Sequence, residues 1–399
     1  MTRPGNLSTL SSISSPVVRV MPNGFSYGGL HPDRALGGTM SPQLSAGPVT
    51  DLGTLSPEAA TEILRRHHDL PGYVTEVTAQ PFGTGQVANC SRLTLSFTGD
   101  RGDAPDSLIG KFASDDANSR GVAAATGLYA RELGFYRELA PGLAVRTPQL
   151  YHADASENGS FALLLEDVAP AQVIDQLDGC GPEHAELAIR EAAALHSSSW
   201  GRDELQNLPW LQSFQPILQA TVEALPGFHA QFRSTYSDLI DSSVLEVADD
   251  LVEAMPSWIR LASPGYALWH HDFRPDNLLF DANNGADPLV VVDWQTVSYG
   301  PAIADVSYFL GCGLTVEDRR AHERELVAIY HDALTDAGVR GPSREECWQA
   351  YLDHAVTAMF MAVHASVRVE RTERGDAMWA SWLERAAAQL TDHDILSRY

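Results

Sequence analysis

Lysine is almost absent from this chain of 399 residues. Lysine and arginine together number 27, and Lys111 is the single lysine among them. The two side chains bind phosphate differently, because arginine presents a planar fork of donors and lysine a compact point charge. The composition therefore indicates Lys111 as a candidate functional residue, although one lysine that survives in an arginine-rich chain would look the same.

Positive charge is also scarce, since the formal net charge is −25 and the sequence pI is about 4.8. Such a surface repels nucleic acid and anionic membranes, so neither is expected as a partner. It would tolerate a neutral or cationic substrate, and it would serve solubility equally well. The chain has no apolar run of about 20 residues and no secretory signal, so we expect a cytoplasmic protein without a membrane span.

Several common site patterns are missing as well. The four cysteines lie far apart and form no C-x-x-C pair, so neither a zinc site nor a disulfide framework is indicated; they are Cys90, Cys180, Cys312 and Cys347. No G-x-x-x-x-G-K-[ST] motif occurs, which disfavours the P-loop class. The sequence leaves the oligomeric state open.

Three regions differ in pattern. Residues 1–50 are rich in Ser, Gly and Pro and predict an extension outside the fold. Residues 51–170 begin with a helix and continue with strands, and they predict a small antiparallel β-rich N-lobe. Residues 171–399 are mostly helical around a short β insert. The fold class is therefore α+β, with a two-lobed, protein-kinase-like arrangement.

Local signals set the expected element boundaries. Three strands are expected between Val74 and Ala113 as an antiparallel meander, followed by a helix over 120–139 and a strand over 161–167. The region 205–262 is expected to be helical but interrupted by prolines. Those prolines are Pro209, Pro216, Pro226 and Pro256.

The most informative stretch runs from Ala267 to Trp294. A short apolar run ends in a loop that carries His270, Asp272 and Asn277, and a second apolar run ends at Asp293. Asp272 has room to act as a base, and an Asn–Asp pair offers the oxygen ligands that a hard divalent cation prefers. The pattern H-x-D-x-x-x-x-N, a strand and then D is typical of the catalytic and metal loops of kinase-like phosphotransferases.

The N-lobe offers three further candidates in the order that such an enzyme needs. Gly83 and Gly85 form a turn whose backbone N–H groups would cover phosphate, or simply a hairpin turn. Lys111 follows on a strand. Glu132 lies in the next helix, either on a solvated face or in an ion pair with Lys111.

Two C-lobe residues remain open. Asp305 lies near a helix start, where it either stabilises the helix end or braces the catalytic loop from below. His196 is more consistent with a packed core histidine than with a functional one. His270 is expected to support the loop by hydrogen bonding.

These segments resemble the aminoglycoside phosphotransferase and choline kinase superfamily, and most closely its ecdysteroid-kinase-like small-molecule kinases. The resemblance spans roughly residues 55–390 in family order. The matching segments are His270–Asn277, Val292–Gln295 and Pro301–Val306, supported by Gly83–Gly85, Ser91–Arg92, Lys111, Glu132–Tyr136, Leu165–Asp167 and Ala194–His196.

The resemblance implies an ATP site between the lobes, Mg²⁺, and transfer of the γ-phosphate to a hydroxyl of a small molecule. It implies these roles: Asp272 as catalytic base, Asn277 and Asp293 as metal ligands, Lys111 with Glu132 as the phosphate-anchoring pair, Gly83 and Gly85 as the turn over the phosphates, and Glu166 to Val168 as the hinge near adenine. One departure stands in the loop itself, since His271 occupies a position where the family usually has glycine.

Rival classes fit less well. A protein kinase would need a long activation segment, but only seven residues separate Asp293 from Pro301 and no A-P-E-like motif follows. A catalytically inactive, kinase-like nucleotide-binding protein is the alternative; it usually lacks the base, the metal aspartate or the lysine, and all three are present. A metal hydrolase would not explain Lys111. Neither the acceptor nor a preference for ATP over GTP can be read from the sequence.

Overall fold

The computed structural model describes residues 48–83, 87–156, 159–211, 213–369 and 371–399. The extension expected at 1–50 therefore lies outside the described residues except for its last three. Of these, Val49 and Thr50 are buried, and Val49 packs in the core under the N-lobe sheet. The backbone oxygen of Val49 also lies 2.9 Å from His152 Nε2. These two residues therefore belong with the N-lobe.

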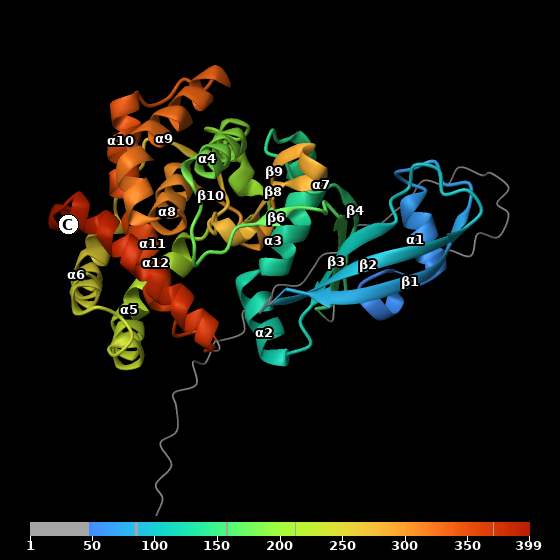
Figure 1. Ribbon diagram of the computed structural model, residues 1–399, viewed down its shortest axis with the longest axis horizontal. Helices are drawn as coiled ribbons and strands as arrows, with labels where there is room; N and C mark the ends of the chain where they lie inside the picture. Colours follow the sequence, from blue (N-terminus) through green and yellow to red (C-terminus); the bar gives the residue numbers. More distant parts are fainter. Residues whose placement is uncertain (1–47, 84–86, 157–158, 212, 370) are drawn as a thin grey trace, which may run out of the picture. The chain divides into compact units, whose positions relative to one another are not determined.

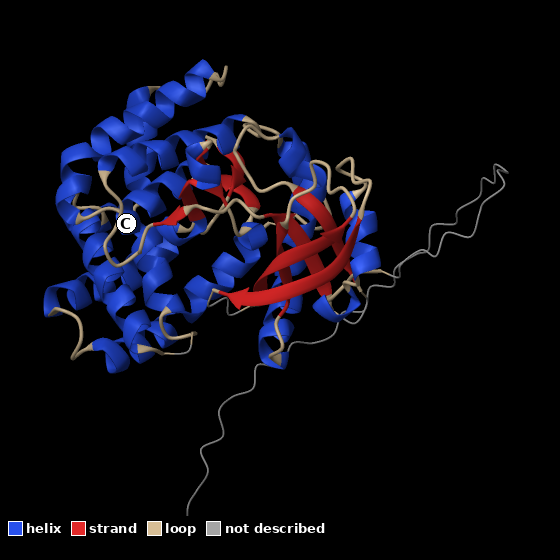
Figure 2. Ribbon diagram, turned by 45° about the vertical axis from the view of Figure 1, so that its right-hand side comes forward, coloured by secondary structure: helices blue, strands red, loops and turns tan. Residues whose placement is uncertain are grey.

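The N-lobe is built on one antiparallel sheet of five strands in the order β1-β2-β3-β5-β4 (Figures 1 and 2). The strands are β1 (Tyr73–Phe82), β2 (Ala88–Thr98), β3 (Ser107–Ala113), β4 (Leu150–Ala155) and β5 (Phe161–Glu166). The meander expected for the first three strands is confirmed. Lys111 pairs in register with Cys90 on β2 and Leu163 on β5, so it lies in the middle of the sheet.

Helices cover both faces of this sheet. Helix α1 (Pro57–Leu64) begins where the Ser56 hydroxyl accepts a hydrogen bond from Ala59 N, at 3.2 Å, and its apolar side packs on one face. Helix α3 (Leu128–Gly134) packs on the other face and continues as a π-helical turn over Phe135–Leu139.

The prediction of a single helix over 120–139 was wrong in one respect. The structure has two helices there, α2 (Ala117–Thr126) and α3, and they meet at Gly127. Gly127 has a φ of +72°, the left-handed conformation in which glycine commonly ends a helix.

The C-lobe is mostly helical and contains two small sheets (Figure 2). Its strands form the orders β6-β8-β9 and β10-β7. The strands are β6 (Gln172–Val173), β7 (Tyr266–Trp269), β8 (Leu278–Asp281), β9 (Asp287–Val291) and β10 (Ser298–Pro301). The helices are α4 (Pro182–Ser197), α5 (Gln215–Tyr236), α6 (Ser242–Trp258), the short α7 (Ala282–Gly285), α8 (Ile303–Gly313), α9 (Val316–Asp336), α10 (Arg344–Asp353), α11 (Val356–Ala365) and α12 (Glu373–Asp392).

Two of the prolines expected to interrupt helices do not end them. Pro226 lies inside α5 and Pro256 inside α6. Both prolines are exposed, and each removes one backbone donor from its helix. The preceding residues, Leu225 and Met255, are fully buried, and their packing holds the helices together at these positions.

The short strands β8 and β9 place the functional loops. Leu278 pairs with Val291 in an antiparallel register, and both side chains are fully buried. The loop before β8 and the residues after β9 therefore emerge side by side. Among the described residues, no helix combines the length and apolar character that crossing a membrane requires.

Candidate active site

The loop between β7 and β8 is held by Asp305, which lies in α8. One oxygen of Asp305 accepts a hydrogen bond from His270 N at 2.6 Å, and the other accepts one from His271 N at 2.9 Å. His196 Nε2 lies 3.2 Å from the same carboxylate. Of the two readings that the sequence left open for Asp305, the structure shows the brace. His196 is fully buried, as expected, and also contacts this brace.

His270 supports the loop by hydrogen bonding, as expected. Its Nε2 lies 2.9 Å from the backbone oxygen of Val292, and its Nδ1 accepts a hydrogen bond from Asp272 N at 3.3 Å. The histidine thereby links the loop to the residues just before Asp293.

Asp272 and Asn277 lie together within this loop. The Asn277 side-chain amide donates to the Asp272 backbone oxygen at 2.8 Å and to Asp272 Oδ2 at 3.0 Å. Burial would raise the pKa of Asp272, but the charge of Arg274 leads the opposing effects that hold the pKa below its usual value. Asp272 is therefore an anion at neutral pH.

Asn277 and Asp293 lie at the ends of adjacent strands. Val292 N donates to the Asn277 backbone oxygen at 3.0 Å, which extends the pairing of β8 with β9 by one step. Asp293 has a φ of +66°, an uncommon left-handed conformation for a residue other than glycine. With both amide hydrogens of Asn277 directed at Asp272, the amide oxygen is the atom that Asn277 can offer to a cation beside Asp293.

Lys111 joins the two lobes. Its Nζ lies 2.8 Å from the Glu132 carboxylate and 2.7 Å from Asp293 Oδ1. Burial would lower the pKa of Lys111, but Asp293 and Glu132 outweigh it and raise the pKa. Lys111 therefore keeps its charge at this point between the lobes, and Glu132 is its partner rather than part of a solvated face.

Aromatic packing holds α3 against the segment after Asp293. The ring of Phe135 stacks on that of Trp294 with centroids 3.9 Å apart and planes 9° from parallel. Both rings are fully buried. This contact fixes the N-lobe helix that carries Glu132 to the C-lobe segment that carries Asp293.

The glycine turn is only partly described. Gly83 follows β1 with a φ of +76°, the left-handed conformation that favours glycine, and no atom of the described residues lies within 4 Å of a Cβ placed there. Gly85 lies outside the described residues.

The expected hinge is already engaged with other parts of the chain. Arg146 donates from two nitrogens to the Glu166 carboxylate, at 2.8 and 3.0 Å. The Val168 backbone oxygen accepts from Asn283 N at 3.0 Å. The Val168 oxygen keeps a second lone pair, so a nucleotide base that bonds it would share it with Asn283 N.

His271 does not point to the proposed metal ligands. Its ring stacks on Trp269 with centroids 4.2 Å apart and meets Phe214 edge-on at 4.6 Å. Its backbone has a φ of +72°. Burial lowers the pKa of His271 to about 4, so the ring is neutral near pH 7, and its buried Nδ1 has no hydrogen-bond partner among the described residues.

Three residues of this site were missed from the sequence. Arg274 Nε donates to Asp272 Oδ1 at 3.1 Å, and the Tyr308 hydroxyl donates to the same oxygen at 2.9 Å. Arg146 also bridges Glu166 to Asp287, at 2.7 Å from Asp287 Oδ2. Arg274 lies only two residues after Asp272, so their contact could have been expected from the sequence. Tyr308 and Arg146 reach their partners only through the fold.

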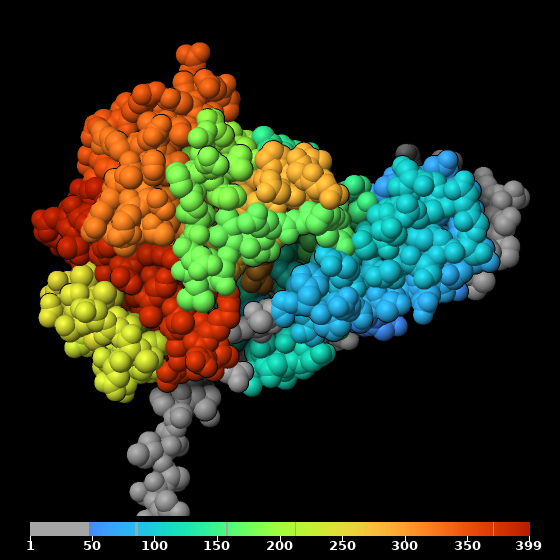
Figure 3. Space-filling view, viewed as in Figure 1, coloured from blue at the N-terminus to red at the C-terminus, as the bar shows by residue number. Residues whose placement is uncertain are grey.

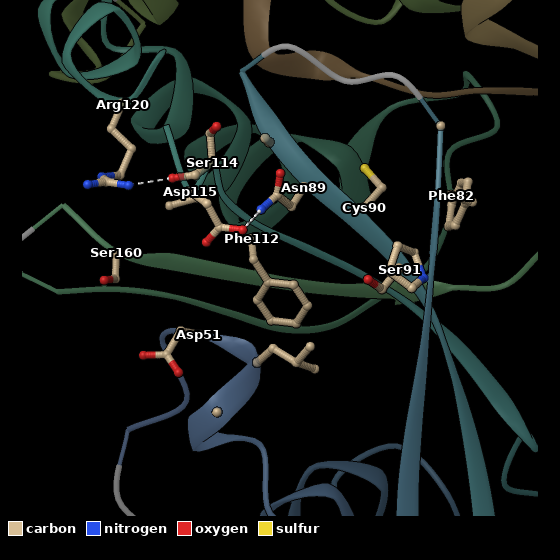
Figure 4. Close-up of a pocket in the computed structure, with 16 residues that line it drawn as sticks. Asp51, Phe82, Asn89, Cys90, Ser91, Phe112, Ser114, Asp115, Arg120 and Ser160 are labelled. Carbon is tan, nitrogen blue, oxygen red and sulfur yellow. Dashed lines mark hydrogen bonds between the residues drawn. The ribbon is translucent and has the colours of Figure 1, made fainter. Parts of the chain in front are cut away.

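A recess opens between the blue and teal N-lobe and the green and red segments of the C-lobe (Figure 3). A separate cavity of about 810 Å³ lies at one end of the N-lobe sheet (Figure 4). Of the predicted site residues that the structure describes, its wall includes Gly83 alone. The polar groups there bond each other: Asn89 donates to Asp115 at 2.9 Å, and Arg120 donates to the Ser114 backbone oxygen at 2.7 Å.

The two-lobed fold is that of the kinase-like class. The chain belongs to the ecdysteroid kinase-like family, whose sequence model matches residues 83–339, more than half of its length. No curated protein sequence matches the chain.

Two solved structures are similar to this chain. A protein from Ralstonia eutropha provisionally described as an aminoglycoside phosphotransferase has a TM-score of 0.50 and 18% identity, over 83% of this chain and 98% of its own. Choline kinase from Cryptosporidium parvum has a TM-score of 0.49 and 15% identity, over 85% of this chain and 98% of its own. At such identities the first likeness supports the fold alone.

Proposed function

We propose that this chain is a small-molecule kinase that uses ATP and Mg²⁺ and transfers the γ-phosphate to a hydroxyl of its acceptor. The observation that carries the proposal is the contact of Lys111 Nζ with both Glu132 and Asp293, at 2.8 and 2.7 Å. Phosphoryl transfer needs positioning and charge stabilisation more than covalent chemistry. Together with the Asp272–Asn277 pair, these side chains supply both.

The N-lobe residues would bind the nucleotide. Lys111, held by Glu132, places a positive charge where the phosphates of ATP would lie. The turn with Gly83 and Gly85 would cover those phosphates with backbone N–H groups. The segment from Glu166 to Val168 would lie beside the adenine.

The oxygen atoms of Asn277 and Asp293 would hold Mg²⁺, which neutralises phosphate charge when bound. Magnesium is commonly held by one or two protein oxygens, with phosphates and waters completing its shell. Asn277 and Asp293 would supply two such oxygens, and the phosphates of the nucleotide would supply others.

Asp272 would orient the acceptor hydroxyl and take its proton. Since its pKa lies below the usual value, the carboxylate is ionised at neutral pH and ready to accept a hydrogen bond from that hydroxyl.

The acceptor is a hydroxyl-bearing small molecule. The charges of the local site do not strongly favour a cationic acceptor over a neutral one. Arg274 pairs with both Asp272 and Asp276, so these carboxylates are partly neutralised in spite of the acidic composition. A substrate screen should therefore include neutral compounds as well as cationic ones.

The test is an ATP-consumption screen over alcohols, sterols, aminosugars and choline analogues, with the Asp272→Ala protein as the blank. We expect at least one acceptor to be phosphorylated. Asp272→Ala and Asp293→Ala should each abolish transfer while circular dichroism shows an intact fold. Full activity in either variant would refute the assignment, and a wild-type chain that binds ADP but phosphorylates nothing would favour the inactive nucleotide-binding alternative.

A further inference from the structure

The carboxylate of Asp272 is not equally available at its two oxygens. Oδ1 accepts two hydrogen bonds, from the Tyr308 hydroxyl at 2.9 Å and from Arg274 Nε at 3.1 Å. From the residues that the structure describes, Oδ2 accepts one, from Asn277 Nδ2 at 3.0 Å. Because each carboxylate oxygen has about two lone-pair sites, Oδ1 is filled and Oδ2 has room for one more donor.

Tyr308 is well placed to fix this arrangement. It lies in α8 one turn after Asp305, which holds the backbone of the same loop. Its side chain is buried, and its ring meets that of Trp382 edge-on with centroids 5.5 Å apart. One helix therefore restrains both the backbone and the carboxylate of the catalytic loop.

The chemistry of Tyr308 suits a fixed donor. Burial raises the pKa of Tyr308 well above its usual value, and the negative charge of the nearby Asp272 raises it further. The hydroxyl therefore stays protonated over the working range of an enzyme, and its hydrogen points at Asp272 Oδ1.

We propose that Tyr308 is a positioning residue that occupies Oδ1 of Asp272 and so directs the acceptor hydroxyl to Oδ2. This rests on the proposed function. In the transfer, the acceptor oxygen forms a bond to the γ-phosphorus, and the bond from that phosphorus to the β–γ bridging oxygen breaks with its electron pair on ADP. The hydroxyl proton passes to Asp272 Oδ2. Tyr308 does not touch the reacting atoms and acts through Asp272.

The consequence is kinetic. Without the hydroxyl of Tyr308, Oδ1 keeps only the hydrogen bond from Arg274 and has room for a second donor. An acceptor hydroxyl can then bind either oxygen, so fewer bound acceptors lie in the reactive geometry. A misplacement of about 1 Å in such a group can slow a reaction roughly 100-fold. Nucleotide binding is expected to be unaffected, since among the described residues Tyr308 makes no hydrogen bond to Lys111, Asn277 or Asp293.

The test compares Tyr308→Phe with Tyr351→Phe. Tyr351 is also fully buried, and its hydroxyl donates to a carboxylate, that of Glu323, at 2.7 Å. Both changes remove one buried hydroxyl from one carboxylate, but only the first alters Asp272. Rates are measured by ATP hydrolysis, with water as acceptor, and with any acceptor that the screen identifies.

We expect kcat of Tyr308→Phe to fall about 10- to 100-fold, with the KM for ATP within about twofold of wild type. Tyr351→Phe should keep its kcat, and it should lose at least as much thermal stability as Tyr308→Phe, because Gln389 Nε2, at 2.9 Å, also loses its acceptor. An unchanged kcat in Tyr308→Phe, or an equal loss in Tyr351→Phe, would overturn the inference. Asp272→Ala is run alongside, because full transfer in that variant would refute the proposed function itself.

Discussion

Lys111 Nζ lies 2.7 Å from Asp293 Oδ1, although the two residues are 182 positions apart in the chain. The same nitrogen lies 2.8 Å from the Glu132 carboxylate. A strand of the N-lobe, a helix of the N-lobe and the strand end that carries Asp293 thus meet at one buried ammonium group. The arrangement joins the candidate phosphate-binding and metal-binding residues in one contact network.

Lys111→Arg tests whether the shape of this cation matters as well as its charge. A guanidinium is planar and wider than an ammonium group, so it cannot lie within 2.8 Å of both carboxylates in the same way. We expect the transfer rate to fall by at least about 100-fold, because the phosphates would lose an aligned ligand. The measurement is the steady-state rate of ATP consumption.

Lys111→Arg keeps the positive charge at this position, so the variant should keep most of the stability of the wild-type protein. Lys111→Met is the companion, because it leaves Glu132 buried without its partner. Breaking a buried ion pair costs about 3 to 5 kcal/mol. Wild-type transfer by Lys111→Arg would show that the single lysine is an accident of composition.

The sequence indicated the candidate site residues themselves, but not the side chains that hydrogen-bond to them. His270, Asp272, Asn277 and Asp293 could be recognised because their spacing places them on one loop and the next strand end. Tyr308 could not, because it lies 36 positions from Asp272 and only the packing of α8 against the loop brings them together.

The expected helix boundaries differed from the structure at prolines and at one glycine. Pro226 reads as a helix breaker, but the local rule omits the burial of Leu225 beside it, which holds α5 together. Gly127 carried a usable signal, since glycine commonly ends helices, but the apolar pattern on both sides favoured one continuous helix. The conformational preference of Gly127 explains why the helix ends there. Tertiary packing explains why α5 continues through Pro226.

His271 provides a prediction about backbone strain. Its φ of +72° suits glycine and disfavours side chains, while its ring gains contacts with Trp269 and Phe214. Alanine would lose the ring contacts and keep the strained backbone, whereas glycine would lose the contacts and relieve the strain. We therefore expect His271→Gly to be more stable than His271→Ala by about 1 kcal/mol in urea unfolding.

Gly121 serves as the matched control for this comparison. It lies inside α2, and a Cβ there would meet no atom within 4 Å. At such a position alanine should exceed glycine in stability by about 0.5 to 1 kcal/mol, the opposite sign. If His271→Ala proved the more stable of the His271 pair, the left-handed backbone would not be the source of strain.

His354 predicts how stability depends on pH. Burial lowers the pKa of His354 to about 4, from an ordinary value of 6.5. As the pH falls below about 6.5, the unfolded chain binds a proton that the folded chain does not, so stability is lost. Between pH 7.5 and 5.5 this one residue should contribute a loss of about 1 kcal/mol.

His354→Gln should remove that contribution. Urea unfolding of both proteins at pH 7.5 and 5.5 measures it, as a shallower fall in the variant. The same replacement at His67, which is exposed, is the control and should leave the fall much closer to that of wild type. An identical fall in wild type and His354→Gln would mean that this ring is protonated in the folded state.

Asp305→Asn tests the brace beneath the loop between β7 and β8. Asp305 is buried, and its two oxygens accept hydrogen bonds from His270 N and His271 N. An asparagine has only one side-chain oxygen, so its NH₂ group would face one of these N–H donors. We expect a loss of about 2 kcal/mol in urea unfolding, because a buried donor is left without an acceptor.

The transfer rate should fall together with stability, because the freed amide lies directly before Asp272. Asp332→Asn is the control, since Asp332 pairs with Arg344 at an exposed position and should cost less than about 1 kcal/mol. The brace would be unnecessary if Asp305→Asn matched wild type in both rate and stability. A loss of stability at full rate would separate its structural role from the chemistry, and would show that the loop keeps its geometry through His270 and the bond from Val292 N to Asn277.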